Sequence, residues 1–187
     1  MKKIVVLNGI HTSGKSTVGR YLNTQGVVYL TEIAMELHKE GIKIGVDGSE
    51  EVQIEMMNRE DTRDNYVMKT NADFAIESWY TAGLAHTRES GNSVYELLED
   101  TLNRKMEEFD PIFVYFDFAP ELIPQRGSKL FDPVDIKVID FYKRLDQHYK
   151  EIYDKYNLNR TFVNADQPLE RVCEEVKEVA LEHFGGA

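Results

Sequence analysis

The sequence predicts an α/β fold in three layers, with a five-stranded, mostly parallel sheet flanked by helices. Two observations lead to this fold class. Short apolar runs alternate with longer stretches of helical pattern, and each connection between runs is long enough for a helical crossover. The 187 residues include 42% hydrophobic and 11% aromatic side chains, which is enough apolar material for a compact core. We therefore expect a single domain spanning residues 1–187.

Five apolar runs are the expected strands. The first, residues 4–7, is continuously apolar and stops at Asn8-Gly9, which is typical of a strand buried on both faces. The second run ends at Thr31-Glu32 and the third at Glu77. Asp110-Pro111 introduces the fourth. The later runs cover residues 27–30, 72–76, 112–116 and 161–163.

The stretches between these runs have helical spacing and end at helix-breaking residues. The first begins near Ser16, after a glycine-rich turn, and stops near Gly26. The second stops at Gly41, and the third is long and polar with few apolar positions. The segment Ser90-Gly91-Asn92 separates the fourth from the fifth. The expected helices cover residues 16–24, 33–39, 50–70, 79–89, 94–108, 134–156 and 168–184.

Charge and composition exclude several functional classes. The chain has 22 Lys and Arg against 33 Asp and Glu, which gives a net charge of −11. An acidic surface of this size argues against nucleic acid or an anionic membrane as the main partner. The lone Cys173 excludes a disulfide framework and a Cys-rich zinc site. No apolar run approaches the roughly 20 residues of a membrane helix, so we expect a cytoplasmic protein.

The segment Gly9–Thr17 matches the phosphate-binding pattern G-x-x-x-x-G-K-[ST] between a strand and a helix. Glycines let backbone N–H groups turn toward phosphate oxygens, and the helix that follows adds the positive end of its dipole. Lys15 is expected to bind the β- and γ-phosphates of ATP, and Ser16 to bind Mg²⁺. With the predicted sheet, this loop indicates a P-loop NTPase fold. The expected nucleotide-binding residues of the loop are Gly9, Thr12, Ser13, Gly14, Lys15, Ser16 and Thr17.

Two carboxylates follow predicted strands, at the sheet edge where α/β proteins bind ligands. Glu32 is a candidate for binding the acceptor hydroxyl or acting as base, although a glutamate at a helix start is also favoured by the helix dipole. Glu77 is a candidate for orienting a Mg²⁺-bound water or the acceptor. Which of the two acts as base stays open. The chain has no guanine-reading N-K-x-D element, and its strand ends fit motor ATPases weakly, so a small-molecule kinase is favoured.

The sequence resembles the thymidylate kinase branch of the P-loop nucleotide kinases. Residues 115–121, Tyr-Phe-Asp-Phe-Ala-Pro-Glu, are similar to the family's Y-L-D-x-x-P-E strand end, and residues 162–170 are similar to its last strand and adenine-side loop. The segment Gln125-Arg126-Gly127-Ser128-Lys129 lies where the family has a basic lid. The resemblance implies ATP as donor, a nucleotide-like acceptor, a homodimer, and a lid at about residues 120–133. Arg126 and Lys129 of that lid would cover the ATP phosphates.

The departures from the family pattern concern the acceptor side. His11 stands where the family has an acidic residue. Thr31-Glu32-Ile33 replaces Arg-Glu-Pro, and Glu77-Ser78-Trp79 replaces Asp-Arg-Tyr. Two arginines that hold the acceptor phosphate in the family are therefore missing, and serine or threonine cannot supply their bidentate recognition. Arginines on the predicted helices are candidate replacements: Arg59, Arg63 and Arg88.

The sequence thus predicts a kinase that transfers the ATP γ-phosphoryl group to a nucleoside monophosphate. A nucleoside or nicotinamide riboside kinase is the alternative within enzymes, because those kinases use an acidic residue after a strand and accept uncharged hydroxyls. A non-catalytic ATP-binding sensor or a regulatory ATPase is the alternative of another class. Trp79 and Tyr80 are candidates for stacking on an acceptor base, although aromatic residues at helical spacing are more often core.

Overall fold

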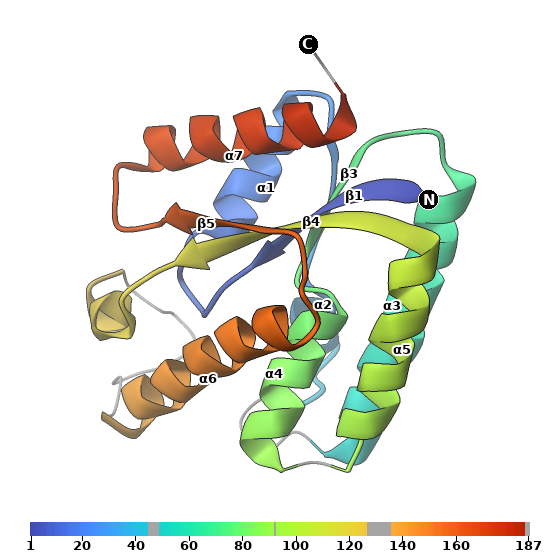
Figure 1. The fold of residues 1–187 in the computed structure, drawn as a ribbon. Helices are drawn as coiled ribbons and strands as arrows, with labels where there is room; N and C mark the ends of the chain where they lie inside the picture. The colour runs from blue at the N-terminus through green and yellow to red at the C-terminus, as the bar shows by residue number, and fades with distance from the viewer. Residues whose placement is uncertain (45–48, 92, 127–135, 186–187) are drawn as a thin grey trace.

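The computed structural model of the protein describes residues 1–44, 49–91, 93–126 and 136–185. Its centre is a five-stranded sheet with the strand order β2-β3-β1-β4-β5 (Figure 1). All four strand pairings are parallel, so the predicted fold class is confirmed. The strands are β1 (Lys2–Asn8), β2 (Val28–Leu30), β3 (Phe74–Glu77), β4 (Phe109–Asp117) and β5 (Arg160–Asn164).

Helices cover both faces of the sheet and complete the three layers. On one face lie α1 (Lys15–Thr24) and α7 (Leu169–Phe184), which pack against each other (Figure 1). The helices of the opposite face are α2 (Ile33–Lys39), α3 (Glu50–Lys69), α4 (Tyr80–Ser90), α5 (Tyr95–Glu108) and α6 (Ile136–Lys155). A 3₁₀ helix, η1 (Pro120–Arg126), covers the first part of the predicted lid. The second part, including Lys129, lies outside the described residues. Among the helices described, none is long and apolar enough to cross a membrane.

The central strand β1 explains why the first apolar run is continuous. It pairs with β3 on one side and β4 on the other, and Ile4, Val5, Val6 and Leu7 are completely buried. Apolar side chains on both faces of a parallel strand contact the helices above and below the sheet. Leu7 lies opposite Glu77 in the pairing with β3. The chain that follows β1 therefore begins beside the end of β3.

The fourth strand begins earlier than predicted. Asp110 and Pro111, expected to introduce it, lie within β4 and pair with Lys3 and Ile4 of β1. Proline cannot donate a ladder hydrogen bond and is therefore restricted to unpaired edges. Pairing with β5 begins only at Phe113, so β4 is still an edge strand on that side at Pro111. This local edge makes the proline compatible with the strand.

Candidate active site

Residues Gly9–Thr17, the P-loop, connect β1 to α1 in a conformation that needs glycine. Gly9 has φ of 143°, and a Cβ atom there would lie 2.9 Å from the backbone oxygen of Phe116. Gly14 has φ of 101° and caps the N-terminus of α1. Both values lie in a region that side-chain-bearing residues avoid. The first helical turn therefore directs its N–H groups at the loop, as an anion site requires.

The polar side chains of the P-loop fit a phosphate ligand. Lys15 is 7% exposed, and its Nζ donates to the carbonyls of Gly9 at 2.7 Å and Ile10 at 3.0 Å. Its charge is thereby held over the loop. Within the described ranges, the hydroxyls of Thr12 and Ser13 are buried without a hydrogen-bond partner. Buried hydroxyls without partners are costly in a folded protein, so their presence here supports a polar ligand.

Glu77, at the end of β3, is joined to the P-loop directly. The Ser16 hydroxyl donates to Glu77 Oε1 at 2.8 Å, and the Tyr29 hydroxyl donates to Glu77 Oε2. Glu77 is 4% exposed, so both carboxylate oxygens are fixed in a buried position. Sequence reasoning did not identify Tyr29. Its partner lies 48 residues away in the sequence, and only the pairing of β2 with β3 brings them together.

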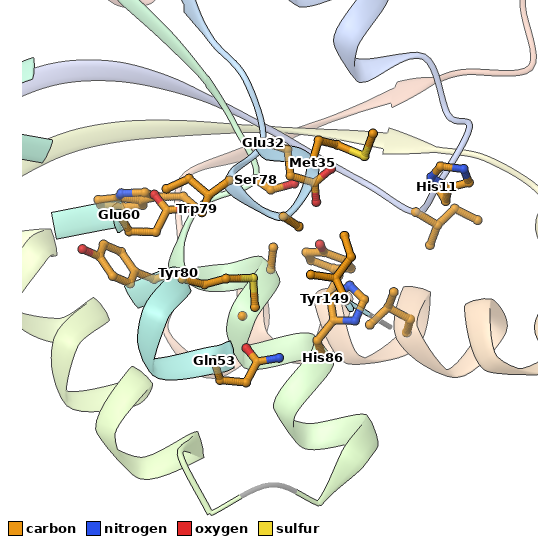
Figure 2. A pocket seen from close by; sticks show the side chains of 18 of the residues that line it. His11, Glu32, Met35, Gln53, Glu60, Ser78, Trp79, Tyr80, His86 and Tyr149 are labelled. Carbon is orange, nitrogen blue, oxygen red and sulfur yellow. The ribbon is translucent and has the colours of Figure 1, made fainter. Parts of the chain in front are cut away.

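A cavity of about 260 Å³ lies beside the P-loop and is lined by residues from six helices, α1 to α6 (Figure 2). Gly9, Ile10, His11 and Lys15 line it on the P-loop side. The other walls come from the ends of β2 and β3 and from α2, α3, α4, α5 and α6, with residues including Glu32, Gln53, Glu60, Ser78, Trp79, Tyr80, His86, Tyr142 and Tyr149. A pocket of mixed apolar and polar walls next to a phosphate loop suits a small organic acceptor.

Glu32 caps α2 and faces this cavity, as predicted from its place after β2. Burial raises the pKa of its carboxyl above the usual range, and the charge of Glu77 acts in the same direction. The charge of Lys15 opposes the shift. A partly buried carboxylate with a raised pKa, close to the phosphate-binding lysine, has the properties of a general base.

Arg63 of α3 ties the two acidic strand ends together. Its Nη1 donates to the Thr31 carbonyl at 2.9 Å, and its Nη2 donates to the Ser78 carbonyl at 2.9 Å. Nη2 also forms an ion pair with Glu60, one turn earlier on α3. Thr31 precedes Glu32 and Ser78 follows Glu77, so one guanidinium fixes the backbone beside both carboxylates.

The other two candidate arginines are engaged away from the cavity. Arg59 forms ion pairs with Glu40 and Glu55, and Arg88 pairs with Glu151 at 2.6 Å. Neither is among the cavity-lining residues, and in the part of the chain described here no arginine lines the cavity.

Two histidines in the cavity wall are held neutral. Burial lowers the pKa of both His11 and His86 to about 4, and the nearby charge of Lys15 acts in the same direction. The ring of His11 is stacked on that of Tyr142, with centroids 6.3 Å apart. His86 contacts Phe141, with ring centroids 6.0 Å apart. At neutral pH these rings add hydrogen-bonding groups, not positive charge, to the cavity.

Trp79 and Tyr80 are buried and also line the cavity. Each is 1% exposed, and both donate to the Asp64 carboxylate, at 3.0 Å from Nε1 of Trp79 and 3.1 Å from the Tyr80 hydroxyl. They are core residues, as the helical spacing favours. They also line the cavity, where they form part of its wall.

Arg126, the last residue of η1, is not among the residues that line the cavity. Its Nη2 donates to the Ala165 carbonyl at 2.6 Å, and its guanidinium lies 4.2 Å from the centre of the Phe118 ring. An ion pair with Asp166 at 3.6 Å completes its contacts. These contacts place Arg126 against the loop after β5, which the resemblance assigns to the adenine side.

The sequence missed a second set of site residues on α3. Gln53, Met56, Met57 and Glu60 line the cavity at a spacing of three, four and seven residues, which is one face of a helix. The sequence pattern suggested only a long polar helix. The helical spacing of Gln53 and Glu60 with the two methionines puts them on one face of α3. The sequence alone does not show that this face points toward the cavity.

Comparisons with known proteins agree with this geometry. No family model matches the chain. Thymidylate kinase from Bacillus thuringiensis (strain Al Hakam) is 31% identical over 70 residues, and thymidylate kinase from Bacillus cereus (strain B4264) is 30% identical over 70 residues. Each match covers 35% of this chain and 34% of the relative. The chain thus matches about a third of the length of these curated relatives.

A solved structure extends the similarity to nearly the whole chain. Deoxyadenosine kinase from M. mycoides, solved with the products dCMP and a flexible dCDP bound, matches 96% of this chain and 99% of its own, with a TM-score of 0.63. The predicted resemblance to the P-loop nucleoside and nucleotide kinases is confirmed. At 14% identity the solved structure shows a shared fold. All the proteins named here are phosphotransferases by name.

Proposed function

We propose that this protein is a kinase that transfers the γ-phosphoryl group of ATP to a hydroxyl of an unphosphorylated, nucleoside-like acceptor. The observation that carries the proposal is the cavity that joins the P-loop residues with Glu32. A phosphate-binding loop on one wall and a partly buried carboxylate on another would bring a donor phosphate and an acceptor hydroxyl next to each other.

The walls of the cavity favour the nucleoside alternative over the nucleoside monophosphate. Of the lysines and arginines in the described ranges, only Lys15 lines the cavity. We assign Lys15 to the donor phosphates. Two carboxylates, Glu32 and Glu60, line the acceptor side. A second phosphate on the acceptor would meet these two acidic groups, whose pKa values are already raised by burial, without a guanidinium to bind it. The name of the structural neighbour, a deoxyadenosine kinase, supports the same choice.

The P-loop supplies the donor side of the reaction. Lys15 neutralises charge on the transferred phosphoryl group, and the backbone N–H groups at the start of α1 bind its oxygens. Mg²⁺ would be held by the Ser16 hydroxyl and, through water, by Glu77, and would neutralise phosphate charge. The half-buried Ser16 hydroxyl and the buried Glu77 carboxylate, which are hydrogen-bonded to each other, fit this hard cation because it prefers oxygen ligands.

Glu32 is the proposed base. Both oxygens of Glu77 accept hydrogen bonds, from Ser16 and Tyr29, whereas Glu32 faces the cavity with a raised pKa. The acceptor oxygen forms a bond to the γ-phosphorus, and the bond from phosphorus to the β–γ bridging oxygen breaks. The acceptor proton passes to Glu32 and ADP leaves. Glu77 then serves to orient the Ser16 hydroxyl.

The lid roles of Arg126 and Lys129 remain part of the proposal. Arg126 would stabilise ATP from the loop after β5, where its contacts with Ala165 and Phe118 hold it. A single domain, a homodimer, a cytoplasmic location and the absence of a nucleic-acid partner stay predictions from the sequence.

A coupled ADP-release assay with Mg-ATP tests the proposed function. The acceptor panel holds ribonucleosides, deoxyribonucleosides, nicotinamide riboside and the nucleoside 5′-monophosphates, and the Lys15→Ala variant gives the background. We expect Lys15-dependent turnover with at least one unphosphorylated acceptor. Turnover with monophosphates alone would support the prediction from the sequence that the acceptor is a nucleoside monophosphate. ATP binding without turnover on any acceptor would favour the sensor or regulatory ATPase.

A further inference from the structure

Glu60 lies on the side of the cavity away from His11 of the P-loop (Figure 2). Its side chain lines the cavity, yet the residue is only 8% exposed. In Figure 2, Glu60 lies beside Trp79 at one side of the pocket, His11 of the P-loop lies at the other side, and Glu32 is between them. An acceptor whose hydroxyl meets Glu32 and the P-loop therefore directs its opposite end, the base of a nucleoside, toward Glu60.

The two carboxylate oxygens of Glu60 have different surroundings. Oε2 accepts from Arg63, which is itself fixed by the carbonyls of Thr31 and Ser78. Among the residues that the structure describes, none donates to Oε1, and Oε1 is not one of the atoms sequestered without a partner. An atom that has no partner and is not sequestered is open to the space beside it, which here is the cavity. Glu60 thus presents one fixed hydrogen-bond acceptor to a bound molecule.

We propose that Glu60 determines acceptor specificity by accepting a hydrogen bond from an amino group on the acceptor's base. This inference rests on the proposed function and names the acceptor class, nucleosides with an exocyclic amino group. A base with a carbonyl oxygen at the same position would place two acceptors face to face. The Glu60 oxygen and the carbonyl oxygen would each lose a hydrogen bond to water without gaining another. Binding of a base with that carbonyl is therefore disfavoured.

Burial raises the pKa of Glu60 to about 8, and the charges of Asp64 and Glu32 act in the same direction. Arg63 opposes this shift by donating to the carboxylate, and an incoming amino group that donates to Oε1 favours the ionised form in the same way. Asp64 and Glu32 are the nearby acidic groups, and Asp64 is already occupied by Trp79, Tyr80 and Lys105. Of these neighbouring carboxylates on α3, Glu60 therefore has an oxygen available to accept a hydrogen bond from a bound molecule.

The test uses matched acceptors that differ in amino group against carbonyl: adenosine with inosine, and cytidine with uridine, each also as the deoxynucleoside. Values of kcat/KM are measured at pH 9, above the pKa of about 8 of Glu60, for the wild type, Glu60→Gln and Glu51→Gln. Glu51 is exposed on the same helix and does not line the cavity, so its variant is the matched control. In Glu60→Gln, Arg63 holds the amide oxygen and leaves the amide N–H₂ toward the cavity, where it donates to a carbonyl.

We expect the wild type and Glu51→Gln to prefer the amino member of an accepted pair by at least about 10-fold. We expect Glu60→Gln to lose or reverse that preference. Turnover without an amino preference, or with the same preference in Glu60→Gln, would overturn the inference and leave the proposed function standing. Absence of Lys15-dependent turnover with every nucleoside would overturn both. The wild-type comparison alone decides the matter if Glu60→Gln does not fold.

Discussion

The Ser16 hydroxyl donates a 2.8 Å hydrogen bond to Oε1 of Glu77, which joins the P-loop to the end of β3. Tyr29 of β2 donates to the second oxygen of the same carboxylate. Three neighbouring segments of the sheet edge thus meet at one buried group. The arrangement fixes the hydroxyl that we assign to Mg²⁺, and of the two glutamates that follow strands it leaves Glu32 to face the acceptor hydroxyl.

Replacing Glu77 with glutamine is expected to lower kcat by about 100-fold. The amide keeps the shape of the side chain but removes the negative charge beside Ser16, and its N–H₂ group cannot accept a hydrogen bond from Ser16 or Tyr29. Steady-state kinetics and ATP titration calorimetry measure the two consequences separately. Tyr29→Phe, which leaves the Ser16 hydrogen bond in place, should cause a smaller loss. Equal kcat values in wild type and Glu77→Gln would contradict the assigned role.

Glu32→Gln is expected to lower kcat by about 10²- to 10⁴-fold, the usual contribution of a general base. The base must be ionised, and burial raises the pKa of Glu32. In the wild type, kcat/KM should therefore rise with pH as Glu32 loses its proton, at a pH above the usual titration range of a glutamate. The rise should be absent in Glu32→Gln. Glu36→Gln, on the exposed side of α2, should keep the wild-type profile. If kcat/KM still rises with pH in Glu32→Gln, the titration belongs to another group.

Gly19→Ala is expected to destabilise the protein by about 1–3 kcal/mol and to reduce activity. A Cβ atom at Gly19 would lie 2.2 Å from Cε2 of Tyr29, so the aromatic ring must move. The ring is held at its other end by the hydrogen bond to Glu77, and the displacement therefore reaches the site. Urea unfolding measures the stability and the kinase assay measures the activity.

Gly83→Ala provides the comparison for this prediction. The Cβ atom there would lie 3.2 Å from a Leu98 side-chain carbon, which can shift slightly, so a much smaller loss of stability is expected. Gly83 lines the cavity, so this variant is the control for stability and not for activity. An unchanged midpoint in Gly19→Ala would show that Tyr29 relaxes without cost and would contradict the coupling.

The fold and the donor side of the site were predictable because their signals are local. The apolar run at residues 4–7 identifies a buried strand, and the P-loop pattern identifies the residues around it. Glu32 and Glu77 were found by their places after strands, since parallel strands bring their carboxyl ends to one edge. These signals need only a few consecutive residues to be read.

The contribution of α3 to the acceptor side was not predictable, because it depends on the rotation of this helix about its axis. The helix is polar around most of its surface, so no apolar stripe indicates which face turns inward. Arg59 and Arg63 were equal candidates in the sequence. The structure places Arg63 between the Thr31 and Ser78 carbonyls and turns Arg59 toward Glu40. The same rotation of α3 brings Glu60 into the cavity wall.

Acid should destabilise the protein through His86. Burial lowers the pKa of this histidine to about 4, from an unfolded value of 6.5, so the unfolded state binds a proton that the folded state does not. Stability is therefore complete above pH 6.5 and falls as the pH drops from 6.5 toward 4, by about 3 kcal/mol for this group.

His86→Asn removes that proton-binding difference and should flatten this part of the pH dependence, although the smaller side chain will lower stability at pH 7.5. Urea unfolding at pH 7.5 and pH 5 gives the comparison, with His38→Asn as the control because His38 is exposed. The loss of stability between the two pH values should be smaller in His86→Asn than in the wild type and His38→Asn. An equal loss in all three proteins would show that protonation of His86 does not cause the pH dependence of the free energy of unfolding.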